Sequence, residues 1–332
     1  MPLAMTVETK IDSLSPTRAW PLLASLTTPH GRRKSFFENA RLTYAGARKR
    51  TFKRARFLLL AASRYRLHDV WFRLLESPAM QPMLARQPLL RAKIQHSYVL
   101  SGIGTADRLL LASEHFRAFL DRVPPAFGAM IYQGAGLPLA EIETPSARYA
   151  LRLLHLPHCW QEGEMSLGLF ENAMLIGSAT LVLGTAHDFS PERPDEMALF
   201  VGGLQGLQGG DGQDAFRRAT KAMQGLRPFS LLIHALRSLA RSLGARHLLA
   251  VADAHHALRY KRAKRRIHLS YDDIWREHAA TTTASGMFDL GTATVLKDLA
   301  DIPSHKRAQY RRRYAMMETV DADIAAALRH CG

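Results

Sequence analysis

The chain has 332 residues, enough for one large domain or two of medium size. Its 47% hydrophobic and 22% charged residues are typical of a globular protein and argue against intrinsic disorder as the main state. Lys and Arg outnumber Asp and Glu by 45 to 29, a formal net charge of +16, so the surface attracts polyanions such as nucleic acid, acidic lipid or phosphate-bearing cofactors.

Residues 1–50 are expected to form a loosely ordered basic segment, since prolines interrupt any helix in its first part. Residues 1–14 have no apolar core typical of a signal peptide. The best apolar runs, 57–62 and 197–204, are far shorter than the ~20 residues of a membrane-spanning helix. We therefore expect a cytoplasmic protein, attached at most to the surface of the inner membrane.

Residues 51–125 have a helical pattern. Helices are predicted at 65–75, 89–100 and 106–122, with prolines between the first two. Residues 126–330 then form a mixed α/β region, and the sequence leaves open whether it is one domain with residues 51–125.

The strands of the mixed region are predicted first. Short apolar or alternating runs indicate strands at 129–132, 148–156, 164–170, 175–183 and 196–201, the third and fourth forming a hairpin. Helices at 214–223, from Pro228 to Gly244, at 271–278 and at 304–330 follow, with a strand at 247–252. The fold class is α+β: a helical N-terminal half, a mixed sheet flanked by helices, and a basic C-terminal helix.

Two glycine-containing segments are candidate phosphate sites. Residues 200–212 are glycine-rich but lack the spacing of a P-loop or a dinucleotide fingerprint, which favours a flexible surface loop. Residues 224–230 open the strongest predicted helix, whose free amides, together with Arg227, can hold a pyrophosphate. An ordinary helix start with a solvated Arg227 explains that turn equally well.

Cysteine and histidine offer little chemistry. Cys159 and Cys331 are far apart, which excludes a disulfide framework and a cysteine-rich zinc site. No carboxylate or cysteine completes a metal site around the His155/His158 or His255/His256 pairs, so no metal is predicted. There is no nucleophile motif. By position alone, Glu196 is the candidate general base and Tyr260 or Tyr271 the candidate acid.

Two basic clusters contain tyrosines. One runs from Arg259 to Arg266 and includes Tyr260, and the other runs from Lys306 to Arg313 and includes Tyr310. Basic residues interleaved with aromatics suit phosphates and stacking. Solvation, or pairing with carboxylates, is slightly favoured over a binding role.

Four strings occur together in a fixed order: 200–206 (FVGGLQG), 220–228 (TKAMQGLRP), 270–275 (SYDDIW) and 302–314 (IPSHKRAQYRRRY). Over about residues 60 to 328 the chain thereby resembles the bacterial VirK/YbjX family, defined by a domain of unknown function. The resemblance implies a link to virulence, envelope integrity and antimicrobial-peptide resistance in Gram-negative bacteria, but no reaction. At 288–291 (FDLG) the sequence departs from the proline expected after leucine in the family.

The order of predicted elements also resembles GNAT-type acyltransferases. In that fold, amides at a helix start hold the pyrophosphate of acyl-coenzyme A, a role that would fall here to Gln224, Gly225, Arg227 and Ser230. The usual Arg/Gln-x-x-Gly-x-Gly/Ala loop is absent, and a glycine-rich insertion with its own helix precedes the turn. Similarity of fold does not by itself establish function.

Three hypotheses remain. The first is a GNAT-like acyltransferase, or a catalytically altered relative, that uses an acyl-coenzyme A or similar carrier and acts on an amine of an envelope precursor, peptide or protein. The second is a non-catalytic accessory protein whose basic clusters bind acidic lipid or an envelope-assembly partner. The third, nucleic-acid binding, rests on charge alone. The sequence does not fix the oligomeric state.

Overall fold

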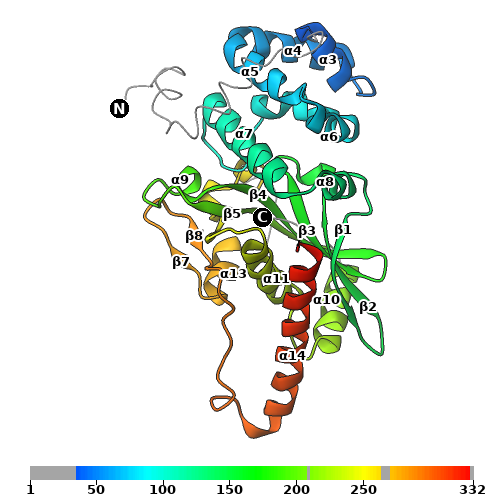
Figure 1. The fold of residues 1–332 in the computed structure, drawn as a ribbon, viewed down its shortest axis with the longest axis vertical. Helices are drawn as coiled ribbons and strands as arrows, with labels where there is room; N and C mark the ends of the chain where they lie inside the picture. The colour runs from blue at the N-terminus through cyan, green and yellow to red at the C-terminus, as the bar shows by residue number, and fades with distance from the viewer. Residues whose placement is uncertain (1–34, 208–209, 263–269, 330–332) are drawn as a thin grey trace. The chain divides into compact units, whose positions relative to one another are not determined.

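The computed structural model describes residues 35–207, 210–262 and 270–329 (Figure 1). They fall into two compact units. Unit 1 comprises the described residues up to Tyr98 together with Gly102–Arg117, and unit 2 comprises Val99–Ser101 and the described residues from Ala118 onward. Within these ranges no helix has a stretch long and apolar enough to cross a membrane.

Unit 1 is helical, as predicted for this part of the chain. Its core includes the buried Trp71, whose indole N–H donates to the Leu90 carbonyl at 3.0 Å, and the stacked rings of Phe57 and Phe72. The elements are α3 (Phe36–Thr43), α4 (Arg50–Ser63), α5 (Tyr65–Leu75), η1 (Pro78–Met80), α6 (Gln81–Arg86), η2 (Pro88–Gln95) and α7 (Thr105–Arg122), the last of which ends in unit 2.

Unit 2 is built on an eight-stranded mixed sheet with the order β1-β2-β3-β4-β5-β6-β8-β7. All neighbours are antiparallel except β5 and β6, which run parallel. The strands are β1 (Leu137–Glu143), β2 (Arg148–Leu154), β3 (Met165–Glu171), β4 (Met174–Thr185), β5 (Met197–Gly206), β6 (His247–Ala250), β7 (Thr281–Thr282) and β8 (Phe288–Asp289). The predicted mixed sheet and its β3–β4 hairpin are confirmed.

Helices of unit 2 pack on this sheet. α11 contacts β3, β4 and β6 and lies side by side with α14, which also contacts β1 (Figure 1). Because sheet and helix cover α11 together, most of its side chains are buried. The helical elements are α8 (Pro125–Tyr132), η3 (Pro157–Cys159), α9 (Ala186–Phe189), α10 (Gly210–Ala222), α11 (Pro228–Ser242), η4 (Asp253–His255), α12 (Arg259–Arg262), α13 (Tyr271–Glu277) and α14 (Ser304–Ala327).

Several local predictions were wrong. Residues 129–132 belong to α8 rather than to a strand, because a short apolar run does not distinguish the two and Pro125 starts a helix well. Residues 200–206 are the second half of β5 rather than a surface loop. Residues 89–100 form most of the 3₁₀ segment η2 and then irregular chain, with Leu100 bridged to His256. The edge strand β1 was not predicted, and it contains Pro138, which only an edge strand tolerates.

Candidate functional site

The parallel strands β5 and β6 pair over only part of their length. Their register runs from Ala198↔His247 to Val201↔Ala250, after which β5 continues beside β4 alone. The Val251 amide still donates to the Val201 carbonyl at 2.9 Å, but the Val251 carbonyl accepts the indole N–H of Trp275 at 2.8 Å, so the hydrogen bonds between β5 and β6 end at this point. Ligands in open α/β sheets bind beyond the carboxyl ends of parallel strands, where the direction of pairing changes. This opening is therefore the first place to look for a site.

A bulge in β5 lies at the same point. The register with β4 shifts from Leu181↔Val201 to Thr180↔Gly203, which leaves Gly202 as an extra residue. Bulges are frequent next to active sites because they redirect nearby groups. A Cβ on Gly202 would lie 1.9 Å from the Glu162 carbonyl oxygen, and one on Gly203 would lie 2.5 Å from Glu162 Oε2. Both glycines thus make room for Glu162.

Glu162 is the centre of a buried polar cluster. Its Oε2 accepts the Gln205 amide at 2.8 Å, and its Oε1 lies 3.3 Å from Nε2 of His256. Nδ1 of His256 accepts the Leu258 amide at 3.2 Å, which assigns the ring proton to Nε2, facing the carboxylate. Glu162 and His256 are 3% and 2% exposed, whereas Gln205 is half-buried and leads to the surface.

The side chains of Tyr271 and Cys159 border this cluster. The ring of Tyr271 meets that of His256 edge to face at 5.3 Å. Cys159 is buried, and burial first, then the Glu162 carboxylate, raises the pKa of its thiol to about 12. The cysteine is therefore protonated at neutral pH and has no nucleophilic role in this form.

The segment Val99–Ser101 crosses the same region in a strained conformation. Val99 has a φ of 58°, a left-handed value that is an outlier for a β-branched residue. Its amide donates to the Gln161 carbonyl, and the Ser101 amide donates to that of His255, both at 2.8 Å. Such strain costs of order 1–3 kcal/mol and clusters at functional sites. It is independent support for a site around Glu162.

The predicted carrier turn has a different local role at its start. Gln224 has a φ of 55°, and the Gly225 amide donates to the Thr220 carbonyl at 2.8 Å, the pattern that ends a helix, here α10. The Gln224 carbonyl accepts Arg313 Nη2 at 2.8 Å, and its side-chain oxygen accepts Arg312 Nε at 3.1 Å. Through these two bonds Gln224 anchors α14.

The rest of that turn lies at the start of α11. Arg227 is its N-cap and, exposed, forms an ion pair with Glu277. The Ser230 hydroxyl lies 3.4 Å from Nε2 of His278. Burial first, then the Arg237 and Arg227 guanidinium groups, lowers the pKa of His278 to about 4, so this imidazole is neutral at pH 7. Because Glu277 ends α13 and His278 caps it, while Tyr271 begins it, this short helix connects the carrier turn to the Glu162 cluster.

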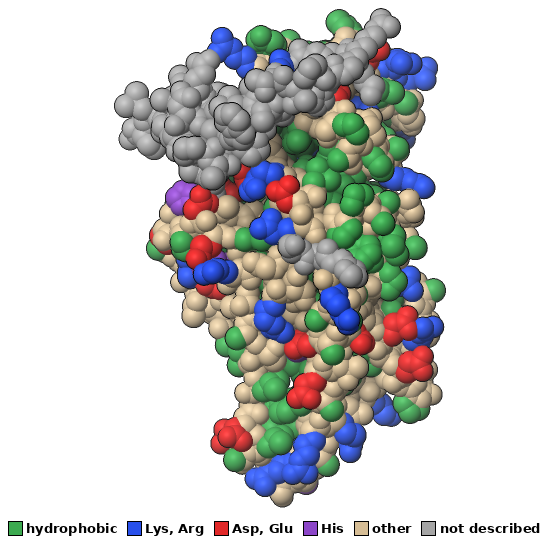
Figure 2. All heavy atoms as spheres, in the orientation of Figure 1, with side chains coloured by type: hydrophobic (Ala, Val, Ile, Leu, Met, Phe, Trp, Pro, Cys, Tyr) green, Lys and Arg blue, Asp and Glu red, His purple; other side chains and the backbone are tan. Residues whose placement is uncertain are grey.

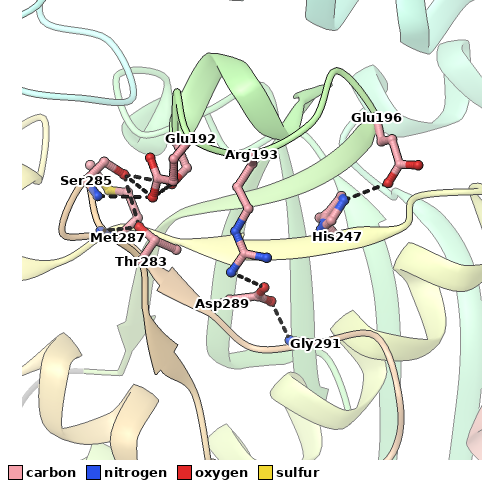
Figure 3. Close-up of polar contacts among 10 residues, drawn as sticks. Glu192, Arg193, Glu196, His247, Thr283, Ser285, Met287, Asp289 and Gly291 are labelled. Carbon is pink, nitrogen blue, oxygen red and sulfur yellow. Dashed lines mark hydrogen bonds and ion pairs between the residues drawn. The ribbon is translucent and has the colours of Figure 1, made fainter.

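The other predicted catalytic residues lie elsewhere. Glu196 precedes β5, at the opposite end of the strand from the bulge, where its carboxylate contacts His247 Nε2 at 3.0 Å (Figure 3). The same carboxylate contacts Arg246 Nη1 at 3.2 Å. Tyr260 is exposed on α12, four residues beyond His256. The structure thus places Tyr271 beside the cluster and does not bring Glu196 together with the carrier turn.

Polar contacts near Glu196 tie the β7–β8 hairpin to the β4–β5 connection. Arg193 forms an ion pair with Asp289 at 2.8 Å, and Glu192 accepts the Ser285 amide at 3.1 Å (Figure 3). Hydrogen bonds, first of all from the Ser190 hydroxyl, lower the pKa of Glu192 to about 2. Each of these groups has a structural partner. We therefore interpret the set as a connection between segments and not as a reactive centre.

The basic clusters are only partly described. Of the first, residues 263–269 lie outside the described residues, and Arg259 donates to the Ala254 carbonyl at 3.0 Å. In the second, Arg307 donates to the Ile302 and Ala300 carbonyls. Lys306 and Arg311 are exposed, and within the described ranges neither has an ion-pair partner.

Metal ligands are not gathered in the part of the chain that the structure describes, where no group of three or more His, Cys, Asp or Glu side chains fits an ion. His256 instead belongs to the Glu162 cluster. His155 faces the Glu164 carbonyl through Nδ1 at 2.9 Å and stacks on Tyr132.

Glu162, Gln205 and the role of His256 were missed from the sequence. The one available signal was the Gly202-Gly203 pair inside an apolar run, since glycine within a strand marks a bulge or a close approach. The loop that brings Glu162 there leaves no such signal.

Comparisons with known proteins cover nearly the whole chain. The model of a family described as protein of unknown function (DUF535) matches residues 46–326. The uncharacterized protein YbjX of Escherichia coli K12 is 28% identical over 286 residues, which cover 85% of this chain and 84% of that protein. An uncharacterized protein of Haemophilus influenzae is 29% identical over 126 residues, 38% of this chain and 43% of its own. No solved structure is significantly similar.

Proposed function

The chain belongs to the DUF535 family of proteins of unknown function, in line with its VirK/YbjX-like strings, and we propose that it transfers an acyl group from coenzyme A or a similar carrier to an amine. The observation that carries the proposal is the parting of β5 from β6 at a bulge, followed by α11. In the GNAT-type fold, which the order of these elements resembles, amides at a helix start hold the pyrophosphate of the carrier.

The start of α11 is the proposed carrier site. Its first amides have no intrahelical acceptor, and they lie at the positive end of the helix dipole, which suits a pyrophosphate. Arg227 adds an exposed guanidinium, and Ser230 adds a hydroxyl in the first turn. Gln224 and Gly225 support this site indirectly, because both fix the turn between α10 and α11 and Gln224 binds α14.

Proton transfer is assigned to the Glu162 cluster rather than to Glu196. When an amine attacks a thioester, a C–N bond forms, the C–S bond breaks, the amine loses a proton and the sulfur gains one. Glu162 is the proposed acceptor of the first proton and Tyr271 the proposed donor of the second, with Tyr260 as the exposed alternative.

The test is thermal unfolding of the full chain with coenzyme A and with acetyl-, medium- and long-chain acyl-coenzyme A. A carrier that binds only the native state at ~100 times its Kd adds about 2.7 kcal/mol of stability. We expect a saturable shift that Arg227→Ala removes and that Arg217→Ala, an exposed ion-paired arginine of α10, leaves in place. Absence of a shift with every carrier would refute the proposal.

Membrane attachment is a second candidate function, favoured by the segment before α14. Val295 and Leu296 are 61% and 44% exposed. Lys and Arg side chains gather at the end of unit 2 formed by the start of α14, where Lys306 and Arg311 lie (Figure 2). Exposed apolar residues, together with cations that have no ion-pair partner among the described residues, suit an anionic lipid surface.

Vesicle co-sedimentation tests this second function. We expect binding to vesicles that contain phosphatidylglycerol, loss of binding in high salt, and no binding to pure phosphatidylcholine. Lys306→Gln combined with Arg311→Gln should weaken it, and so should Val295→Ser combined with Leu296→Ser, whereas Arg217→Gln should not. Equal binding to both kinds of vesicle would exclude an electrostatic attachment.

A further inference from the structure

Unit 1 contains a pocket of about 150 Å³ that no proposed role of unit 2 uses. Cationic and polar side chains from α5, η2, α7 and the junction between α4 and α5 line it. They are Arg64, His68, Gln95, Thr105 and Arg108. A cavity with convergent polar groups is the usual form of a small-molecule site.

The two arginines of the pocket are not neutralised by contact with a carboxylate. Arg108 donates through Nη2 to the Ile103 carbonyl at 2.8 Å, while its buried Nε has no acceptor among the described residues. Arg64 has no hydrogen-bond or ion-pair partner for its guanidinium within the same ranges. The pKa of Arg108 is lowered by burial first and then by the Arg64 guanidinium, so the two positive fields overlap. The Asp107 carboxylate accepts the Gly104 amide at 3.0 Å, and its charge acts in the opposite direction on the pKa of Arg108.

The remaining wall is rigid and neutral. His68 is 1% exposed, its Nδ1 faces the Arg64 carbonyl at 3.0 Å, and the Gln95 amide lies 3.0 Å from its Nε2. Burial lowers the pKa of His68, which keeps the imidazole neutral at pH 7. Thr105 begins α7, a helix of 18 residues, so the positive end of that helix dipole also lies at the pocket.

We propose that this pocket binds the phosphate group of a small phosphorylated ligand, with Arg64 and Arg108 as the charged contacts. Two forked guanidinium groups match the charge and the oxygens of a phosphate better than those of a single carboxylate. The shared chemistry is that of inorganic phosphate and of a phosphate monoester. The proposal is independent of acyl transfer, because each of its residues belongs to unit 1.

The experiment is calorimetric titration of the full chain with inorganic phosphate and, separately, with methyl phosphate, at constant ionic strength. Arg64→Gln is the informative variant, because the Arg64 side chain makes no hydrogen bond that the fold would lose. Arg50→Gln, which removes the same charge from the exposed start of α4, is the matched control. Circular dichroism of both variants verifies that they fold.

Saturable binding that weakens at least about tenfold in Arg64→Gln, equivalent to about 1.4 kcal/mol, and persists in Arg50→Gln would support the site. Equal or tighter binding of methyl phosphate would identify an ester as the ligand, and a preference for inorganic phosphate would identify the free anion. Absence of saturable binding up to millimolar concentrations, or an Arg64→Gln variant that binds like the parent, would overturn the proposal.

Discussion

Nε2 of His256 lies 3.3 Å from Oε1 of Glu162, and both side chains are almost completely buried. The second carboxylate oxygen accepts the Gln205 amide, so Glu162 faces a donor on each side. Burial of a carboxyl group is costly unless polar groups surround it, and here Gln205 binds one oxygen while the His256 ring lies beside the other without completing a hydrogen bond among the described residues. The stability of the fold should therefore depend on the number of hydrogen-bond acceptors that the side chain of residue 162 offers.

Glu162→Gln is expected to destabilise the fold. A glutamine of the same shape offers one oxygen and one NH₂ group, so either the His256 or the Gln205 donor then faces another donor. An unsatisfied buried group costs about 1–3 kcal/mol. Urea unfolding measures the loss, and Glu277→Gln, which changes an exposed ion pair, should cost under about 1 kcal/mol. Equal losses in the two variants would contradict the described cluster.

Val99 allows a test of backbone strain. At most positions an Ala variant is more stable than a Gly variant by about 0.5–1 kcal/mol. At a φ of 58° this order should invert, because alanine retains the steric cost of the left-handed region and glycine does not. Chemical denaturation of Val99→Ala and Val99→Gly gives the comparison. An alanine variant more stable than the glycine variant would show that residue 99 is not strained.

His115 predicts a pH dependence of stability. Burial first, then Lys93, lowers its pKa from 6.5 to about 3 in the folded chain. Between these values the unfolded chain binds a proton that the folded chain does not, so stability falls as pH decreases from 6.5 towards 3. One such proton gives a slope of about 1.4 kcal/mol per pH unit.

The pH profile of unfolding free energy checks this slope in His115→Leu. The variant should lose up to one proton's contribution to the slope between pH 4 and 6, whatever its absolute stability. His305→Leu, which changes an exposed histidine of α14, should retain the parent slope. A parent-like slope in His115→Leu would assign the dependence to other groups.

Cys159 should be unreactive in the native protein. Its side chain is 1% exposed, and its raised pKa of about 12 leaves almost no thiolate at pH 8. In a Cys331→Ser variant, which retains Cys159 alone, a disulfide reagent should release no chromophore until urea unfolds the chain. Rapid reaction under native conditions would mean that the region around Glu162 opens readily.

The elements with strong local signals were predictable. α11 begins with Pro228 at its first position, its apolar face repeats at helical spacing, and Gly244 follows it with a φ of 73°. The β3–β4 hairpin was found for a similar reason, since Asn172 takes a left-handed turn conformation with a φ of 54° between two apolar runs. In both cases the residues that define the element are neighbours in the sequence.

The candidate site was not predictable in the same way. Glu162 and His256 come from connections far apart in the chain and Gln205 comes from β5, and only the register of β4, β5 and β6 brings the three together. Glu196 is predicted as the general base because it lies at the start of a strand. Its position relative to the bulge, however, depends on the direction of β5 in the sheet. The pocket of unit 1 likewise depends on packing between helices.

The packing of α14 against both α11 and β1 has a consequence for the order in which the chain folds. β1 is the first strand of the sheet to be synthesised. The buried residues of α14, which include Val320 and Ile324, are synthesised much later. Contacts of such long sequence separation slow folding, because a large loop must close before they form. During translation, therefore, unit 1 can complete its core while the sheet of unit 2 still lacks α14. In that period an apolar surface is exposed that a chaperone can bind.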